Sequence, residues 1–332
     1  MTVHRRKFVY AVLVLALSYL THCQTVAIDL SDLPVLKYGT AWKNEKTADL
    51  VYKAIKSGFR HIDTACQPRH YREDLVGEGW TRAAKELGLS RSELHLQTKF
   101  SGAKAHEPGT EPYDINAPLE EQVRQSLKKS LENLQTSYLD SWISEFLYLT
   151  HASMHLKLHV YNTMEEAVDA GTVKQIGISN FYQLEDVQWL YEHARIKPKV
   201  LQNRFYPETN HDAELRSFCK AQGIEYQSFW TLTANEHAIH SPPALEIAQE
   251  RGVSPEVLFY AFCMAIGISP LDGSTSEEHM REDMELMDRI RGGKKFFRNK
   301  SELETILLVL GFTHEFDRST LLHTEEYAAE EL

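Results

Sequence analysis

The chain has 332 residues and a formal net charge of −11, and a quarter of its residues are charged. The length allows one large domain or two ordinary ones, and the supply of aliphatic and aromatic residues excludes an intrinsically disordered chain. The deficit of lysine and arginine argues against nucleic acid as the main partner, because binding to phosphates needs an excess of positive charge.

A basic and then apolar segment stands at the N-terminus. Residues 4–7 are basic, residues 8–20 are uncharged and almost all apolar, and small residues precede Gln24. This order is typical of a secretory signal peptide, and the apolar run is short for a transmembrane helix, which needs about 20 residues. We expect residues 1–23 to be a signal peptide or an uncleaved membrane anchor that directs the chain to the secretory pathway or to a membrane. Alternatively, the segment is an artefact of gene prediction and the protein is cytoplasmic. The odd number of cysteines beyond the segment would suit a cytoplasmic protein.

The rest of the chain alternates between short apolar runs and longer helical patterns. The apolar or β-branched runs predict eight strands, at residues 35–40, 61–64, 94–100, 138–144, 173–180, 200–205, 225–230 and 268–273. Apolar residues with helical spacing predict helices at residues 46–57, 73–87, 119–134, 164–170, 184–194, 212–222, 254–266 and 276–289.

Eight strand–helix units without a break in composition favour a single (β/α)8 TIM barrel over two domains. An open doubly wound sheet is the alternative, but it would normally bring a glycine-rich first turn, and this sequence has none. We expect the barrel to span residues 24–290. Residues 291–332 would form a tail with one helix, at 303–310, and an acidic end. We expect a monomer.

The four cysteines, at positions 23, 66, 219 and 263, show no paired spacing. A disulfide framework or a zinc site is therefore not expected. The sequence also contains no HExxH motif and no P-loop. We predict no metal site.

Polar residues at the ends of the predicted strands are the candidates for chemistry, because active sites of such barrels lie at the C-terminal ends of the strands. Lys99, in QTKF, ends an apolar strand and needs a counter-charge, for which Asp63, in HIDTA, is the nearest candidate. A buried Asp–Lys pair is expected to lower the pKa of a neighbouring tyrosine and make it a proton donor. Tyr71 lies in the loop after Asp63. A lone aspartate at a strand end could instead only cap the next helix.

The motifs HIDTA with a following tyrosine and VGE, then TKF, LD, QIGISNF and LQNRF, resemble those of the aldo-keto reductases in the same order. The resemblance covers about residues 33–287 and is closest to a divergent branch of the family. It implies an NAD(P)H-dependent oxidoreductase that reduces an aldehyde, a ketone or an enone. Its catalytic residues would be Asp63, Lys99 and Tyr71, with Tyr71 as general acid. The loop is two residues longer than usual and puts His70 in the usual register, but only Tyr71 carries a phenol.

The same resemblance implies a nicotinamide cofactor, NADP by family habit, with NAD possible. Ser179, Asn180 and Gln202 resemble the residues that bind the carboxamide, and Phe229 resembles the aromatic that stacks on the nicotinamide. The full set that the resemblance implies for the cofactor is Gly39, Thr40, Ser179, Asn180, Gln202, Phe229, Trp230, Leu232, Ser274, Thr275, His279 and Asp283. Many members read the 2′-phosphate with a Pro-Lys-Ser motif and an arginine, which this sequence lacks, and Asp272 would repel that phosphate.

Glu145 is a further departure from the family pattern. It stands five residues after Asp140, where most members have a histidine that orients the substrate carbonyl. In a minority of members a glutamate stands there and accompanies reduction of a conjugated C=C bond. We expect Glu145 to set the substrate class. The alternative is an impaired site in a cofactor-binding barrel that serves as a regulatory or interaction subunit.

Overall fold

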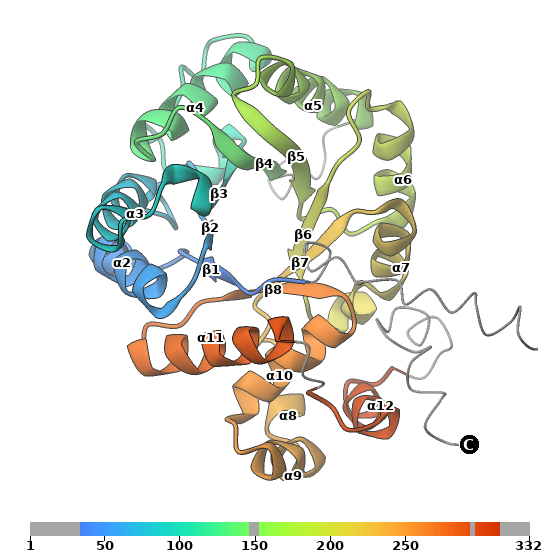
Figure 1. Ribbon diagram of the computed structural model, residues 1–332. Helices are drawn as coiled ribbons and strands as arrows, with labels where there is room; N and C mark the ends of the chain where they lie inside the picture. Colours follow the sequence, from blue (N-terminus) through green and yellow to red (C-terminus); the bar gives the residue numbers. More distant parts are fainter. Residues whose placement is uncertain (1–33, 146–152, 293–295, 313–332) are drawn as a thin grey trace, which may run out of the picture. The chain divides into compact units, whose positions relative to one another are not determined.

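Eight parallel strands pair in chain order and close into a barrel (Figure 1). The computed structural model describes residues 34–145, 153–292 and 296–312 of the chain. The predicted (β/α)8 barrel is confirmed. The strands are β1 (Lys37–Gly39), β2 (His61–Asp63), β3 (His95–Ser101), β4 (Leu139–Glu145), β5 (Val173–Ser179), β6 (Val200–Arg204), β7 (Glu225–Phe229) and β8 (Ile268–Asp272).

Helices surround the barrel as an outer layer (Figure 1). The described helices are α2 (Thr47–Ser57), α3 (Glu73–Leu87), α4 (Leu119–Asn133), α5 (Met154–Asp169), α6 (Leu184–His193), α7 (Ala213–Gln222), α8 (Glu236–Ile239), α9 (Pro242–Arg251), α10 (Pro255–Ala265), α11 (Glu277–Arg291) and α12 (Lys300–Val309). Short 3-10 helices are η2 (Asn44–Lys46), η3 (Arg91–Glu93), η4 (Ala103–Ala105) and η6 (Pro207–Asp212). Helix α2 illustrates the packing of this layer, since Leu50, Val51, Ala54 and Ile55 on one of its faces are buried.

Helix α5 begins earlier than predicted. The periodicity predicted a start at residue 164, but the helix begins at Met154, where the Ser153 hydroxyl accepts a hydrogen bond from the Leu156 N–H. The polar first turns hid the pattern, because Lys157 is buried with its ammonium group 4.6 Å from the Phe181 ring centroid. A charged residue can cover apolar surface with its stem, which a hydrophobicity pattern does not register.

Two helices, α8 and α9, were not predicted. The two prolines after Ser241 favour a turn in the sequence, but proline is also tolerated in the first turn of a helix. The Ser241 hydroxyl caps α9 by accepting a hydrogen bond from the Ala244 N–H at 3.4 Å. Only Ala244, Ile247 and Ala248 of α9 are buried, so its apolar stripe is narrow.

The register of the strands determines which side chains point into the barrel. Neighbouring residues across parallel strands share a side, and Asp63 of β2 is opposite Gln97 of β3. Side chains alternate along a strand, so Lys99, two residues later, points to the same side as Gln97. Ser179 of β5 is opposite Gln202 of β6 in the same way. The polar ends of β2 to β6 therefore converge at one mouth of the barrel.

Gly177 of β5 packs tightly against Val200 of β6 beneath this mouth. A Cβ atom at this position would be 2.6 Å from the Val200 carbonyl oxygen and 2.7 Å from the Val200 Cβ. We therefore expect Gly177→Ala to lower the free energy of unfolding by about 1–3 kcal/mol, the usual cost of overpacking. Denaturant titration would compare the free energies of unfolding of Gly177→Ala and of a control variant, Gly273→Ala. The Cβ of the control would meet no atom within 4 Å. Equal stability of the two variants would contradict the close packing.

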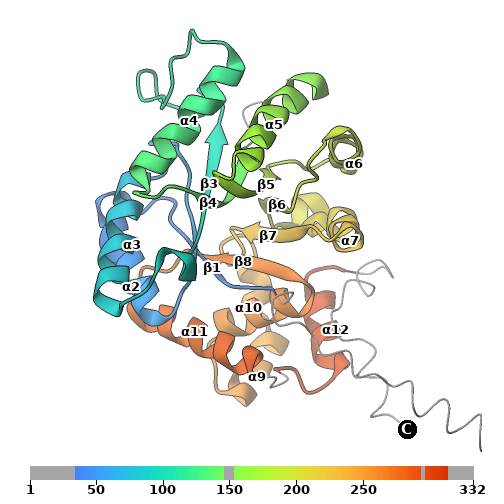
Figure 2. The ribbon, with the colours of Figure 1, turned by 45° about the horizontal axis from the view of Figure 1, so that its top comes forward.

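The helix predicted in the tail is present as α12. It lies next to α9 (Figure 2), and Leu303 and Ile306 are buried in the core. Arg251 at the end of α9 pairs with Glu302 of α12. The proposed targeting segment, residues 1–23, and the acidic end beyond residue 312 lie outside the described residues.

Within the described ranges, no helix is long and apolar enough to cross a membrane. Cys66, Cys219 and Cys263 are buried free thiols. The same ranges contain no cluster of histidine, cysteine and carboxylate side chains that could hold a metal ion.

Candidate active site

A buried ion pair stands at the mouth of the barrel. The Lys99 ammonium group donates to Asp63 Oδ2 at 2.6 Å and to the Thr64 carbonyl oxygen at 2.9 Å. The side chains of Lys99 and Asp63 are 3% and 1% exposed, so water screens neither of the two charges. Burial lowers the pKa of Lys99, but the charges of Asp63 and Tyr71 outweigh it and hold that pKa above its ordinary value. The predicted pairing of Asp63 with Lys99 is thus present in the structure.

Tyr71 lies beside this pair. Its N–H donates to the Gln67 carbonyl oxygen at 3.1 Å, and the Lys99 ammonium group is 5.1 Å from the centroid of its ring. Burial raises the pKa of Tyr71 to about 12, although Lys99 acts to lower it. The expectation that the ion pair lowers this pKa below that of free tyrosine is therefore wrong, because desolvation outweighs the lysine. Tyr71 is a protonated phenol at neutral pH, as a proton donor must be.

The neighbouring His70 faces a different partner. Its ring packs on the Trp42 ring with centroids 4.1 Å apart, and the Trp42 N–H donates to its carbonyl oxygen at 2.7 Å. Burial and the charge of Arg69 lower the pKa of His70. Both His70 and Tyr71 line the pocket, but Tyr71 is the one whose ring lies beside the lysine of the ion pair.

Glutamine side chains form a hydrogen-bond network with Asp63. Its second oxygen, Oδ1, accepts hydrogen bonds from Gln97 at 2.7 Å and from Gln202 at 2.9 Å. Both glutamines also donate to Gln227 Oε1, at 2.7 and 3.0 Å. Gln97 and Gln227 were not predicted as site residues. The signal was present, since each stands two residues before an inward-pointing site residue, Lys99 or Phe229, on the same strand.

Glu145, at the end of β4, faces the same mouth. Its Oε2 accepts a hydrogen bond from the Ser101 hydroxyl at 2.5 Å, and its Oε1 accepts one from the Asn180 amide at 3.3 Å. Burial raises the pKa of Glu145, against the lowering effects of Ser101 and Lys99. A carboxyl group with a raised pKa can be protonated when a ligand excludes water, and then it donates a hydrogen bond.

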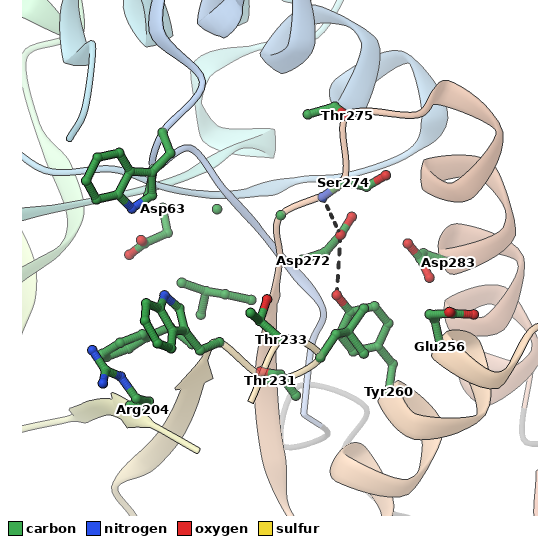
Figure 3. Close-up of a pocket in the computed structure, with 18 of the residues that line it drawn as sticks. Asp63, Arg204, Thr231, Thr233, Glu256, Tyr260, Asp272, Ser274, Thr275 and Asp283 are labelled. Carbon is green, nitrogen blue, oxygen red and sulfur yellow. Dashed lines mark hydrogen bonds between the residues drawn. The ribbon is translucent and has the colours of Figure 1, made fainter. Parts of the chain in front are cut away.

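These side chains open into one long pocket of about 910 Å³. Asp63 and Arg204 lie toward one end of it, and Glu256 and Asp283 lie toward the other, with Thr231 and Thr233 between them (Figure 3). All four predicted catalytic residues line it. So do the predicted cofactor residues Gly39, Ser179, Asn180, Gln202, Phe229, Trp230, Leu232, Ser274, Thr275, His279 and Asp283.

Thr40 is the one predicted cofactor residue that is not part of the lining. It is fully buried, and its hydroxyl donates to the Asp63 carbonyl oxygen at 2.9 Å. Thr40 therefore ties the end of β1 to β2 behind the ion pair. Arg204 was not predicted either, but it lines the pocket with its guanidinium carbon 3.9 Å from the Trp230 ring centroid. Strand alternation would have found it, because Arg204 follows Gln202 by two residues.

The residues that build this site match a known family. The family model described as "Aldo/keto reductase family" matches residues 36–291. The chain belongs to the aldo/keto reductase family. It is 32% identical to NADPH-dependent codeinone reductase 1-4 of Papaver somniferum over 288 residues, which cover 77% of this chain and 82% of that protein. It is 30% identical to NAD(P)H-dependent D-xylose reductase of Pachysolen tannophilus, over 73% and 81% of the two chains.

The fold of the chain is shared with solved structures of the same family. The aldo-keto reductase of Bombyx mori in complex with NADP matches with a TM-score of 0.65 at 20% identity, over 88% of this chain and 92% of that one. Family membership supports NAD(P)H-dependent oxidoreductase chemistry on small carbonyl compounds.

The described residues fit a nicotinamide dinucleotide. Ser179, Asn180 and Gln202 are buried polar side chains that reach the pocket at one level, where a carboxamide group would find donors and acceptors. Phe229 lines the pocket beside them and offers a ring for stacking. The volume of the pocket is at the upper end of the range for small-molecule and cofactor sites.

Proposed function

We propose that this chain reduces small aldehydes, ketones or enones with NAD(P)H, and that Tyr71 donates the proton. The observation that carries the proposal is the position of Tyr71 beside the buried Lys99–Asp63 pair at the inner end of the pocket. A protonated phenol next to a cation suits the protonation of a carbonyl oxygen, because the cation stabilises the phenolate that forms.

The roles of the side chains follow from their contacts. The bound nicotinamide would supply the hydride that reaches the carbonyl carbon. Tyr71 gives its proton to the carbonyl oxygen, and the Lys99 ammonium group stabilises the resulting phenolate. Asp63 holds Lys99 charged and in place through the 2.6 Å hydrogen bond, and the glutamine network holds Asp63. Glu145 and Tyr71 line the same mouth, so a carbonyl oxygen between them can accept two hydrogen bonds.

The assay for this proposal is the oxidation of NADH and NADPH with a panel of aldehydes, saturated ketones and enones, with product analysis. Consumption of cofactor in step with formation of an alcohol or a saturated ketone is the expected result. The second candidate, a regulatory barrel without turnover, is motivated by Glu145 in the place of a histidine. It would be supported if the protein bound a cofactor tightly and consumed none with any carbonyl compound.

Glu145 is proposed to select the substrate class. Burial raises the pKa of Glu145. In its protonated form this carboxyl group polarises a carbonyl oxygen more strongly than a neutral imidazole does, and this favours attack at the β-carbon of an enone. We expect Glu145→His to raise kcat/KM for a saturated ketone relative to its enone analogue by about tenfold or more, a difference of about 1.4 kcal/mol in barrier. The ratio is measured in both variants with the same ketone–enone pair. An unchanged ratio would show that Glu145 does not set the substrate class.

Three finer proposals rest on the sequence or on relatives. Names of relatives, such as NADPH-dependent codeinone reductase, favour NADPH, whereas Asp272 and Asp283 in the pocket of this chain oppose a 2′-phosphate. Residues 1–23 are proposed to direct the chain to the secretory pathway or a membrane. The barrel is proposed to act as a monomer.

A further inference from the structure

Two buried carboxyl groups meet at the far end of the pocket. Asp272 ends β8 and Asp283 lies on α11; they are 2% and 3% exposed, and both line the pocket. Burial and the charge of the neighbouring Asp272 raise the pKa of Asp283 to about 9. Burial also raises the pKa of Asp272, because both carboxyl groups are removed from water.

One carboxylate oxygen of Asp272 lacks a hydrogen-bond donor in the described part of the chain. Asp272 Oδ1 accepts hydrogen bonds from the Ser274 N–H at 2.7 Å and from the Tyr260 hydroxyl at 3.4 Å (Figure 3). Asp272 Oδ2 is buried and accepts no N–H or hydroxyl donor from the described residues. A buried carboxylate oxygen without such a donor is costly unless a ligand supplies one.

The charges around the pair are mostly of the same sign. Glu256 of α10 and Glu282 of α11 line this end of the pocket, and no lysine or arginine of the described chain lines it there. The nearest cation is Lys43, whose ammonium group donates to the Gly273 carbonyl oxygen at 2.7 Å. Burial lowers the pKa of Lys43 to about 8, although Asp272 opposes this. Two exposed histidines, His240 and His279, also line the pocket.

The length of the pocket determines which part of a bound dinucleotide can reach Asp272 and Asp283. This step rests on the proposed function. With a nicotinamide beside Phe229, the rest of a dinucleotide extends past Thr231 and Thr233 toward Asp272 and Asp283 (Figure 3). Barrels of this class commonly bind phosphate groups near the loops that follow strands 7 and 8. The adenosine ribose would then be closest to the two carboxyl groups.

We propose that the Asp272–Asp283 pair accepts hydrogen bonds from the ribose hydroxyls of a dinucleotide that lacks a 2′-phosphate, and that the chain therefore prefers NADH to NADPH. Carboxylates serve this role in dinucleotide sites that select NAD, whereas arginine accommodates the 2′-phosphate. A 2′-phosphate here would place a second anion against a buried carboxylate and lose the hydroxyl donor as well.

Isothermal titration of the full chain with NADH and with NADPH at neutral pH tests the preference without any turnover. The two ligands differ only by the 2′-phosphate. We expect the Kd of NADH to be at least about tenfold lower than the Kd of NADPH. This ratio corresponds to a difference of about 1.4 kcal/mol in binding free energy. Equal affinities, or tighter binding of NADPH, would overturn the proposal.

Gly273→Lys provides a second arm. A Cβ at Gly273 meets no atom within 4 Å, so the substitution adds a cation beside Ser274 without crowding. NADPH should then bind about tenfold more tightly than to the wild type, with NADH little changed. Glu285→Gln is the control, because it makes the same charge change at an exposed position on α11 outside the pocket. An equal gain in the control would show a general charge effect and contradict the role of this end of the pocket.

The binding and turnover data separate this inference from the proposed function. Tighter binding of NADH with no reduction of any carbonyl would support the carboxyl pair and contradict the reductase. Turnover with a preference for NADPH would support the reductase and overturn the role of the pair. Binding of neither cofactor would overturn both.

Discussion

Replacement of Tyr71 by phenylalanine is expected to lower kcat for carbonyl reduction by about 10²–10⁴-fold, the usual contribution of a general acid. The change removes one hydroxyl and keeps the ring that lies over Lys99, so the pocket keeps its shape. The Kd of the cofactor should stay within about twofold of the wild-type value, because the removed hydroxyl acts in proton transfer and not in binding of the cofactor. Steady-state kinetics and a cofactor titration on the same preparation measure both quantities.

His70→Ala is the matched control for Tyr71→Phe. His70 also lines the pocket, but its ring packs on Trp42. Loss of this contact should raise KM more than it lowers kcat. If His70→Ala abolishes turnover and Tyr71→Phe does not, the family register places the proton donor at His70 and the assignment of Tyr71 is wrong.

Lys99→Met should abolish most of the activity and also change its pH dependence. Alcohol oxidation, the reverse reaction, needs the phenolate form of Tyr71, so its rate rises with pH up to the pKa of Tyr71. Burial raises the pKa of Tyr71 to about 12 overall, and Lys99 opposes this rise. Without Lys99 the pKa rises, and the pH at which oxidation levels off moves upward. An unmoved profile in a residually active variant would contradict the coupling of Lys99 to Tyr71.

Stability has to be separated from chemistry in this variant. Lys99→Met leaves Asp63 as a buried charge without its partner, which costs about 3–5 kcal/mol of folding free energy. The double variant Asp63→Asn/Lys99→Met removes both charges and should recover much of the stability. It should not recover the activity. Recovery of both would mean that the ion pair is only structural.

The barrel and most of its pocket followed from sequence patterns because those patterns are local. Eight apolar runs with polar ends are visible along the chain, and Asp63, Lys99 and Gln202 each stand at or near the end of one of them. The inner faces of the strands could have been followed further, since Gln97 and Arg204 obey the same alternation. The early start of α5 was hidden because Lys157 is charged and yet buried.

Contacts and solvation were out of reach of a one-dimensional pattern. Asp272 and Asp283 are recognisable separately in the sequence, but only the fold brings them to the same end of one pocket. The pKa of Tyr71 had the wrong sign in the prediction because burial, which outweighs Lys99, is a property of the folded loop. Electrostatic effects of a pair can be guessed from its charges, whereas desolvation requires the surroundings.

The central claim is direct reduction of a carbonyl compound in this pocket, and deuterium transfer tests it most directly. NADH or NADPH with deuterium at C4 of the nicotinamide is incubated with the wild-type chain and an aldehyde, ketone or enone that it consumes. The account predicts a product with one deuterium on the former carbonyl carbon, or on the β-carbon of an enone, and almost no product with Tyr71→Phe. Oxidation of cofactor that leaves no deuterium in the product, or a Tyr71→Phe variant as active as the wild type, would contradict it.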